Sequence, residues 1–230
     1  MNEITNNKKL TSNSEDLIID KNILLEDKRN EGETKILIKK DIQVIYKSYF
    51  NTNKIFILEK NASLKYYEIG KNIHTTINLQ GENAECEING LLIGSGKWSI
   101  HTTHQNKLTK SNILIRTIVD KKEKSEIDGL ITINEACPKS EGHESIKNLM
   151  LDKSAIVKAI PRLKISTDDV ICTHDATISQ LKENDLFYLQ SRGLTKENAK
   201  KLLIEGFVNF NETINEMKNE KENILNKNNN

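Results

Sequence analysis

The chain has 230 residues, and its 34 lysines and arginines nearly balance its 33 aspartates and glutamates, so the formal net charge is only +1. Composition therefore gives no electrostatic reason to expect nucleic acid or a membrane surface as a partner. No apolar run approaches the roughly 20 residues needed to span a bilayer, and the first residues lack the apolar core of a secretory signal. We expect a cytoplasmic protein with one sizeable core.

The three cysteines are Cys86, Cys137 and Cys172. An odd number without any C-x-x-C pair does not make a disulfide framework or a zinc-finger pattern. Each thiol is either a small buried apolar group or individually functional, and burial is the favoured interpretation for any one of them.

Residues 1–33 are polar and mixed in charge, and we expect a partly disordered N-terminal arm there. Two short apolar groups, 17–19 and 23–25, could seed a helix or a strand within it.

Residues 34–180 read as one short strand after another, rich in β-branched residues and separated by Asn, Gly, Asp and Lys turns. Residues 113–119 alternate with period two, and helical periodicity is essentially absent. The pattern predicts a mainly β body, either an antiparallel sandwich or a β-solenoid. A hairpin-type Asn-Gly pair occurs once, at Asn89-Gly90, and no strict repeat length decides between the two architectures.

The segment ICTHDATISQ contains the most reactive group of side chains. On an extended strand, Cys172 and His174 project from one face and Asp175 from the other. A thiolate and an imidazole two residues apart suit zinc or iron–sulfur chemistry, although a site needs further ligands. The alternative is a partly buried histidine beside a core cysteine.

Other motifs are weak. His101 and His104 form an H-x-x-H without the helix and glutamate that zinc enzymes need. His143 is expected in a solvated polar loop. The glycines of NGLLIGSGKW have the wrong spacing for a phosphate loop and predict a turn between strands. Clustered carboxylates, which a polysaccharide-active solenoid enzyme would require, do not stand out from the background.

Residues 181–217 predict helices. Asn184 or Asp185 can cap the first helix, and Gly193 can end it in the left-handed conformation. Thr195 is a good N-cap for a second helix. Its apolar stripe contains Ala199, Leu202, Leu203 and Phe207, and the stripe of a third helix contains Phe210, Ile214 and Met217.

Residues 218–230 are expected to fray. The helices are either a cap folded on their own domain or a partner-binding pair.

Residues 161–207 contain P-R-L-K-I, D-D-V, T-H-D-A-T, L-F-Y-L-x-S-R-G-L and A-x-x-L-L-x-x-G-F in this order. This combination resembles the C-terminal core of the SufB/SufD family, the scaffold proteins of SUF iron–sulfur cluster assembly. A looser, collinear likeness extends the resemblance to roughly residues 75–210.

The resemblance implies a right-handed parallel β-helix with a small C-terminal helical domain that docks on a SufC-type ABC ATPase. It implies a non-enzymatic scaffold whose β-helix pairs with a second SufB/SufD-type subunit, either a copy or a paralogue. A transient iron–sulfur cluster would form at that interface, with no tightly bound cofactor. His174, Asp175 and Cys172 are the interface candidates. The docking candidates are Leu186, Phe187, Tyr188, Arg192, Gly193, Leu203 and Phe207.

Two departures from the family pattern matter. The functional cysteine of SufB-type chains falls on Ile146 here, and the acid after the motif histidine is Asp175. The missing cysteine makes the chain closer to SufD, whereas the acid of Asp175 is a SufB-like feature, and Cys172 or Cys137 is a candidate substitute ligand. A docking or stabilising subunit that binds no cluster is the alternative.

Overall fold

The computed structural model describes residues 7–10 and 14–228. Its strands are β1 (Asn7–Leu10), β2 (Ser14–Ile19), β3 (Ile23–Asp27), β4 (Glu33–Ile38), β5 (Gln43–Ser48), β6 (Asn53–Leu58), β7 (Ser63–Ile69), β8 (Ile73–Leu79), β9 (Glu85–Ile93), β10 (Gly96–His104), β11 (Lys110–Val119), β12 (Lys124–Ile133), β13 (Ser140–Met150), β14 (Ile156–Ile165) and β15 (Val170–Gln180). The helices are α1 (Glu183–Ser191), α2 (Lys196–Val208) and α3 (Glu212–Asn228).

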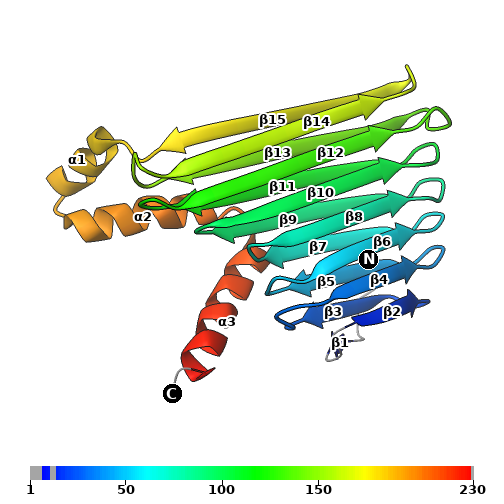
Figure 1. Cartoon of the computed structure of the whole chain (residues 1–230), viewed down its shortest axis with the longest axis horizontal. Coiled ribbons are helices and arrows are strands. Elements are labelled where there is room, and N and C mark those ends of the chain that lie inside the picture. Colours follow the sequence, from blue (N-terminus) through cyan, green and yellow to red (C-terminus); the bar gives the residue numbers. More distant parts are fainter. Residues whose placement is uncertain (1–6, 11–13, 229–230) are drawn as a thin grey trace.

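The strands form two stacked parallel sheets. Odd-numbered strands follow one another from β1 to β15 in one sheet, and even-numbered strands from β2 to β14 in the other (Figure 1). Each turn of the chain therefore adds one strand to each sheet, which is a parallel β-helix. This confirms the solenoid and excludes the antiparallel sandwich, because every pair in both sheets is parallel.

The rungs lengthen along the chain. Gln43 pairs with Ser63 on the next rung, whereas Lys110 pairs with Glu141. Strand β5 has 6 residues and β13 has 11. A lengthening rung destroys any fixed repeat in the sequence, which explains why no period was visible there.

On five successive rungs, one corner is a residue in the left-handed conformation. Asp41, Asn61, Asn83, Leu108 and Lys139 have φ values between 55° and 62° and lie on successive rungs. The Asn61 amide donates to the Asp41 carboxylate at 2.6 Å, and the Asn83 amide donates to the Asn61 side-chain oxygen at 3.2 Å. Asn and Asp tolerate this conformation and can bond along the ladder, which explains their frequency in the turns.

Gly90 lies inside β9, which corrects the interpretation of Asn89-Gly90 as a hairpin turn. The ring of Trp98 packs against it, and a Cβ at this position would lie 2.1 Å from a ring carbon. The glycine is therefore required by close packing across the core. Gly94, with φ of 86°, provides the expected turn between β9 and β10.

The β-helix begins before residue 34, which corrects the expected N-terminal arm. Leu17, Ile19, Ile23 and Leu25 are buried and belong to the main apolar core. Two strands contribute alternating apolar residues here, so the segment buries a face despite its polar composition. Residues 1–6 and 11–13, also part of the predicted arm, lie outside the described residues.

Helix α3 continues as far as Asn228, beyond the expected start of a frayed tail at 218. The Lys221 ammonium donates to the Ile69 carbonyl at 2.7 Å and stacks over the Phe50 ring at 4.7 Å. These contacts hold the helix on the sheet. Residues 229–230 of the predicted tail lie outside the described residues.

The helix boundaries follow most of the predicted signals. Gly193 has φ of 93° directly after α1, and the Thr195 hydroxyl accepts a hydrogen bond from the Asn198 N–H at 3.2 Å. Helix α1, however, starts after Lys182 without a side-chain cap, rather than at Asn184 or Asp185. Leu202 also departs from the predicted stripe, since 47% of it is exposed.

Helices α2 and α3 pack on the outer face of the odd-strand sheet. Arg116 lies over the rings of Phe207 and Phe210, at 5.2 and 4.4 Å from their centroids, and donates to the Phe207 carbonyl. These helices and the sheet form a second apolar cluster that includes Tyr67 and Met217. No helix of the described chain is both long enough and apolar enough to cross a membrane.

Candidate functional site

His174 lies on β15, in the column of side chains that points into the β-helix. It is in register with Glu144 of β13, and Cys172 is in register with Gly142. Because alternate residues face opposite ways, Asp175 points outward, where it accepts a hydrogen bond from the Ser145 hydroxyl at 3.0 Å. The predicted separation of Cys172 and His174 from Asp175 is confirmed.

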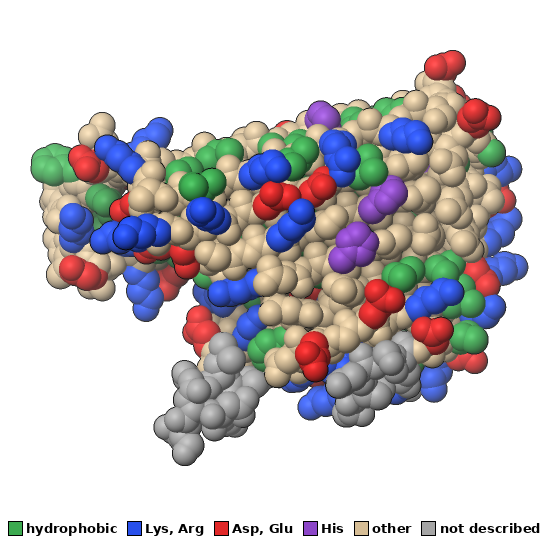
Figure 2. Space-filling view, viewed as in Figure 1, with side chains coloured by type: hydrophobic (Ala, Val, Ile, Leu, Met, Phe, Trp, Pro, Cys, Tyr) green, Lys and Arg blue, Asp and Glu red, His purple; other side chains and the backbone are tan. Residues whose placement is uncertain are grey.

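Strands β14 and β15 are the last strands of their sheets, so no described strand covers the rung that they form. We call this rung the open end. The same inward column that is buried in earlier rungs is accessible here: His174 is exposed, and Ile178 is 53% exposed. Figure 2 shows hydrophobic side chains along the upper edge of the molecule, where Figure 1 places these strands.

Glu144 lies one rung below His174 and was not identified from the sequence. Its side chain is 2% exposed, and neither carboxylate oxygen has a hydrogen-bond partner within the described part of the chain. Burial raises the pKa of this carboxyl group to about 7. The only sequence signal was its inward position between Gly142 and Ile146 in the alternating pattern of β13.

Cys172 is the accessible cysteine of the three. Burial raises the pKa of its thiol, and the nearby charge of Glu144 adds to the effect. Cys86 is buried, as is Cys137, whose thiol donates to the His104 carbonyl at 3.2 Å. Cys137 therefore does not reach the open end. Among the residues described, no three His, Cys, Asp or Glu side chains are already gathered for metal binding.

The remaining histidines are separated by the alternation of the strands. His104 is buried and hydrogen-bonded to Thr109 and Ser111, whereas His101 faces outward and bonds Thr132. The H-x-x-H pair therefore cannot share a ligand. His143 lies on β13 rather than in a loop.

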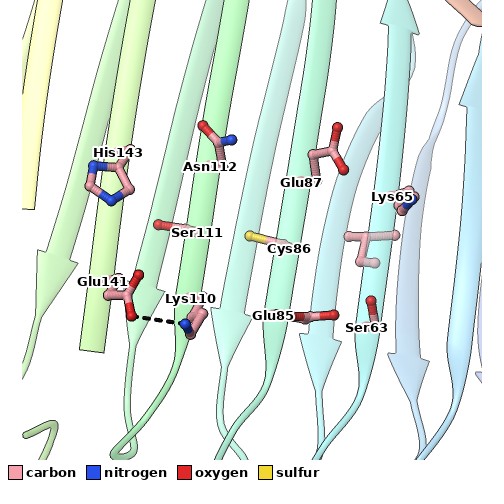
Figure 3. A pocket seen from close by; sticks show the side chains of 11 residues that line it. Ser63, Lys65, Glu85, Cys86, Glu87, Lys110, Ser111, Asn112, Glu141 and His143 are labelled. Atoms are coloured by element: carbon pink, nitrogen blue, oxygen red, sulfur yellow. Dashed lines mark ion pairs between the residues drawn. The ribbon is translucent and has the colours of Figure 1, made fainter. Parts of the chain in front are cut away.

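A groove of about 300 Å³ crosses the outer face of the odd-strand sheet (Figure 3). Its side chains come from β7, β9, β11 and β13, and Lys110 forms an ion pair with Glu141 at 2.8 Å. The groove contains neither His174 nor Cys172, so it is separate from the open end.

The predicted docking residues divide into two groups. Phe187 and Tyr188 are 73% and 59% exposed, and Arg192 stacks over the Tyr188 ring at 5.4 Å beside the Gly193 turn. Three others are partly buried: Leu186, Leu203 and Phe207. Phe207 contacts Arg116 and so holds α2 on the sheet.

A larger groove of about 770 Å³ lies where α1 and α2 meet the ends of the rungs. Five lysines line it, namely Lys121, Lys153, Lys182, Lys196 and Lys200. Asp152 and Glu183 also line this groove, and Leu186 is one of the residues that α1 contributes to it.

The sequence of residues 47–207 matches the protein family described as "SUF system FeS cluster assembly, SufBD core domain". This chain belongs to the SufB/SufD family. It is 33% identical over 138 residues to the iron–sulfur cluster assembly protein SufD of Escherichia coli, and 30% identical over 137 residues to that of Bacillus subtilis. An iron–sulfur cluster assembly SufBD family protein of Pyrococcus horikoshii is 35% identical over 133 residues.

These three alignments cover 56–58% of this chain and 33%, 31% and 29% of the respective relatives. The chain thus matches about a third of each relative's length. Two of these relatives are SufD proteins, so the chain is a SufD-like member of the family.

Proposed function

We propose that this chain is a scaffold subunit of a SUF-type iron–sulfur cluster assembly complex. Its open end would pair with a second SufB/SufD-type subunit, and its C-terminal helices would bind a SufC-type ABC ATPase. The observation that carries the proposal is the uncovered last rung, which presents His174 and Cys172 beside exposed apolar side chains.

The open end has the properties of an interface. Strands β14 and β15 have 10 and 11 residues, and their outer edges have unpaired backbone groups in the described chain. Long uncovered edges with apolar side chains pair readily with another chain. A partner with the same kind of rung would cover Ile165 and Ile178 and would enclose His174 between the two subunits.

A charge at the open end tests the pairing. Ile178→Asp places a carboxylate in the inward column, and Ser179→Asp places it on the outer face of the same strand as a matched control. Sedimentation of the chain, alone and with a candidate paralogue, should show dimers for the unchanged chain and the control but not for Ile178→Asp. Equal dimerisation of all three would contradict pairing through this rung.

The C-terminal helices offer the second interface. No residue of α1 is buried, and Phe187 and Tyr188 project from it. Aromatic residues and arginine commonly dominate protein–protein binding energy, and Arg192 lies beside them. Helix α2 anchors this surface on the sheet through Phe207, so the helices remain accessible without detaching.

The ATPase interaction is tested by titration calorimetry with the SufC-type protein of the same organism. Phe187→Ala and Arg192→Ala should each weaken binding about tenfold or more, the loss typical of an interface hot spot. Asn112→Ala, on the outer face of the sheet, serves as the control. Unchanged affinity in both helix variants would argue against docking through α1.

A docking subunit that binds no cluster is the second candidate function. It is favoured by Ile146, a fully buried apolar residue at the place of the SufB-type cysteine. Anaerobic reconstitution followed by absorption spectroscopy separates the two. A cluster that is lost in His174→Ala but kept in His143→Ala supports the scaffold, and no cluster under any condition supports the docking subunit.

A further inference from the structure

The groove of about 770 Å³ where α1 and α2 meet the ends of the rungs has more positive than negative charge, and we call it the lysine groove. Five lysines and two acids line it, which gives a formal excess of three positive charges. Asp120, paired with Lys200 at 3.1 Å, reduces the excess to two. The other four lysines form no ion pair within the described chain, namely Lys121, Lys153, Lys182 and Lys196.

Three of these lysines stack along one end of the odd-strand sheet, the end at which Figure 1 places α1 and α2. Lys121, Lys153 and Lys182 follow β11, β13 and β15, which are neighbouring strands of that sheet. Adjacent strands are about 4.8 Å apart, so ammonium groups at the ends of neighbouring rungs repel one another. Elsewhere on the surface, neighbouring rungs pair opposite charges, as Lys60 does with Glu82 at 2.8 Å. The lysine groove lacks such compensation.

The acid among these lysines, Asp152, is bound by another residue. Its carboxylate accepts hydrogen bonds from the Ser154 hydroxyl at 2.6 Å and from the Ser154 N–H at 2.8 Å. These bonds lower the pKa of Asp152, and the nearby charges of Lys121 and Lys200 lower it further. The aspartate therefore stays ionised, but it leaves the unpaired lysines able to bind a carboxylate from another molecule.

The lining also has apolar contact area. Leu151, Leu181 and Leu186 are partly buried there, and lysine stems can lie along such surface while their ammonium groups stay hydrated. A compact polyphosphate would leave the leucines uncovered and would meet Asp152 and Glu183. None of the lining residues in the described chain is an arginine, so the planar fork that suits phosphate is missing. The lining fits a polypeptide segment that combines carboxylates with an apolar side chain.

We propose that the lysine groove binds an acidic segment of the SufC-type ATPase, with at least two carboxylates beside one apolar side chain. Two carboxylates match the excess positive charge, and the apolar side chain covers the leucines. The inference deepens the proposed function, because it rests on docking of the ATPase through α1. Leu186 lines the groove, and its neighbour Phe187 is 73% exposed on the docking helix. A protein bound to α1 therefore reaches the groove as well.

Binding kinetics on the immobilised ATPase of the same organism test the role of the lysines. Lys153→Glu reverses a charge on the β-helix side of the groove, and Lys196→Glu reverses one on α2; both residues are exposed. Lys65→Glu, exposed on β7, is the matched control with the same change in net charge. We expect each groove variant to dissociate about fivefold faster or more and the control to dissociate at the unchanged rate, because loss of a contact speeds dissociation whereas net charge mainly alters association. Circular dichroism shows whether each variant is folded.

Carbodiimide cross-linking of the complex identifies the group that the lysines bind. The reagent joins an ammonium group and a carboxylate in contact through an amide bond, so mass spectrometry should find Lys153 or Lys196 joined to an acidic residue of the ATPase. Calorimetry with inorganic pyrophosphate examines the small-anion alternative. The proposal is overturned by pyrophosphate binding that Lys153→Glu removes, by an absence of these cross-links, or by groove variants that dissociate no faster than Lys65→Glu.

Phe187→Ala separates this inference from the proposed function. If Phe187→Ala weakens binding while the groove variants behave as the control does, the ATPase docks on α1 without using the groove. That result overturns the inference and leaves the proposed function standing. If neither Phe187→Ala nor the groove variants change binding, docking through α1 is wrong as well.

Discussion

The stability of the β-helix should depend on pH because of His104, and substitution of this one residue should remove that part of the pH dependence. The imidazole is fully buried, and its two nitrogens bond the hydroxyls of Thr109 and Ser111 at 2.8 and 2.9 Å. Burial lowers the pKa of His104 from 6.5 to about 4. The folded protein therefore keeps this histidine neutral at a pH where the unfolded chain protonates it.

The sign follows from proton binding. Between pH 6.5 and 4 the unfolded state binds more protons than the folded state, so stability falls as the pH falls. At about 1.4 kcal/mol per pKa unit, the full loss is about 3 kcal/mol, of which about 2 kcal/mol is lost by pH 5. Above pH 6.5 the contribution is constant.

Urea unfolding at pH 7.5 and pH 5 measures this loss for the unchanged chain and for His104→Gln. The glutamine cannot titrate and can still form a hydrogen bond with one of the two hydroxyls. Any loss of unfolding free energy that the substitution itself causes is therefore the same at both pH values. The unchanged chain should lose about 2 kcal/mol more than the variant over this interval. His143→Gln, on the outer face of β13, controls for a histidine outside the core. Equal losses in His104→Gln and the unchanged chain would refute the reasoning.

Two further predictions concern the anchors of the fold. Arg116→Ala removes the cation stacked on Phe207 and Phe210, so amide hydrogen exchange in α2 and α3 should speed up while the β-helix stays protected. Lys54 and Glu68 form a fully buried ion pair at 2.6 Å. Lys54→Met should cost about 3–5 kcal/mol of unfolding free energy, because it leaves the buried Glu68 carboxylate with the Tyr66 hydroxyl but without its ionic partner. The double variant Lys54→Met, Glu68→Leu should recover most of this loss.

Each of these two predictions has a result that would contradict it. Uniform faster exchange throughout the β-helix of Arg116→Ala would mean that this arginine supports the whole fold rather than the helices. If the double variant is no more stable than Lys54→Met alone, the loss of stability comes from disruption of the buried network and not from the glutamate that lost its ion pair.

The sequence by itself determined the strand-rich body, the helix boundaries at Gly193 and Thr195, and the family. Thr195 and Gly193 act through contacts within a few residues, and the alternation that separates His174 from Asp175 is a property of one strand. Such local signals can be read from the chain because their causes are local.

The tertiary structure alone decided which residues meet across rungs. The place of Gly90 under Trp98 depends on packing across the core between β9 and β10. The start of the β-helix before residue 34 and the buried state of Glu144 depend on register between segments 17 residues apart (Asn7 and Leu24) to 31 residues apart (Ile113 and Glu144). Because rung length changes along the chain, spacing could not give that register. A buried carboxylate below an exposed histidine is therefore a property of stacked rungs rather than of any single segment.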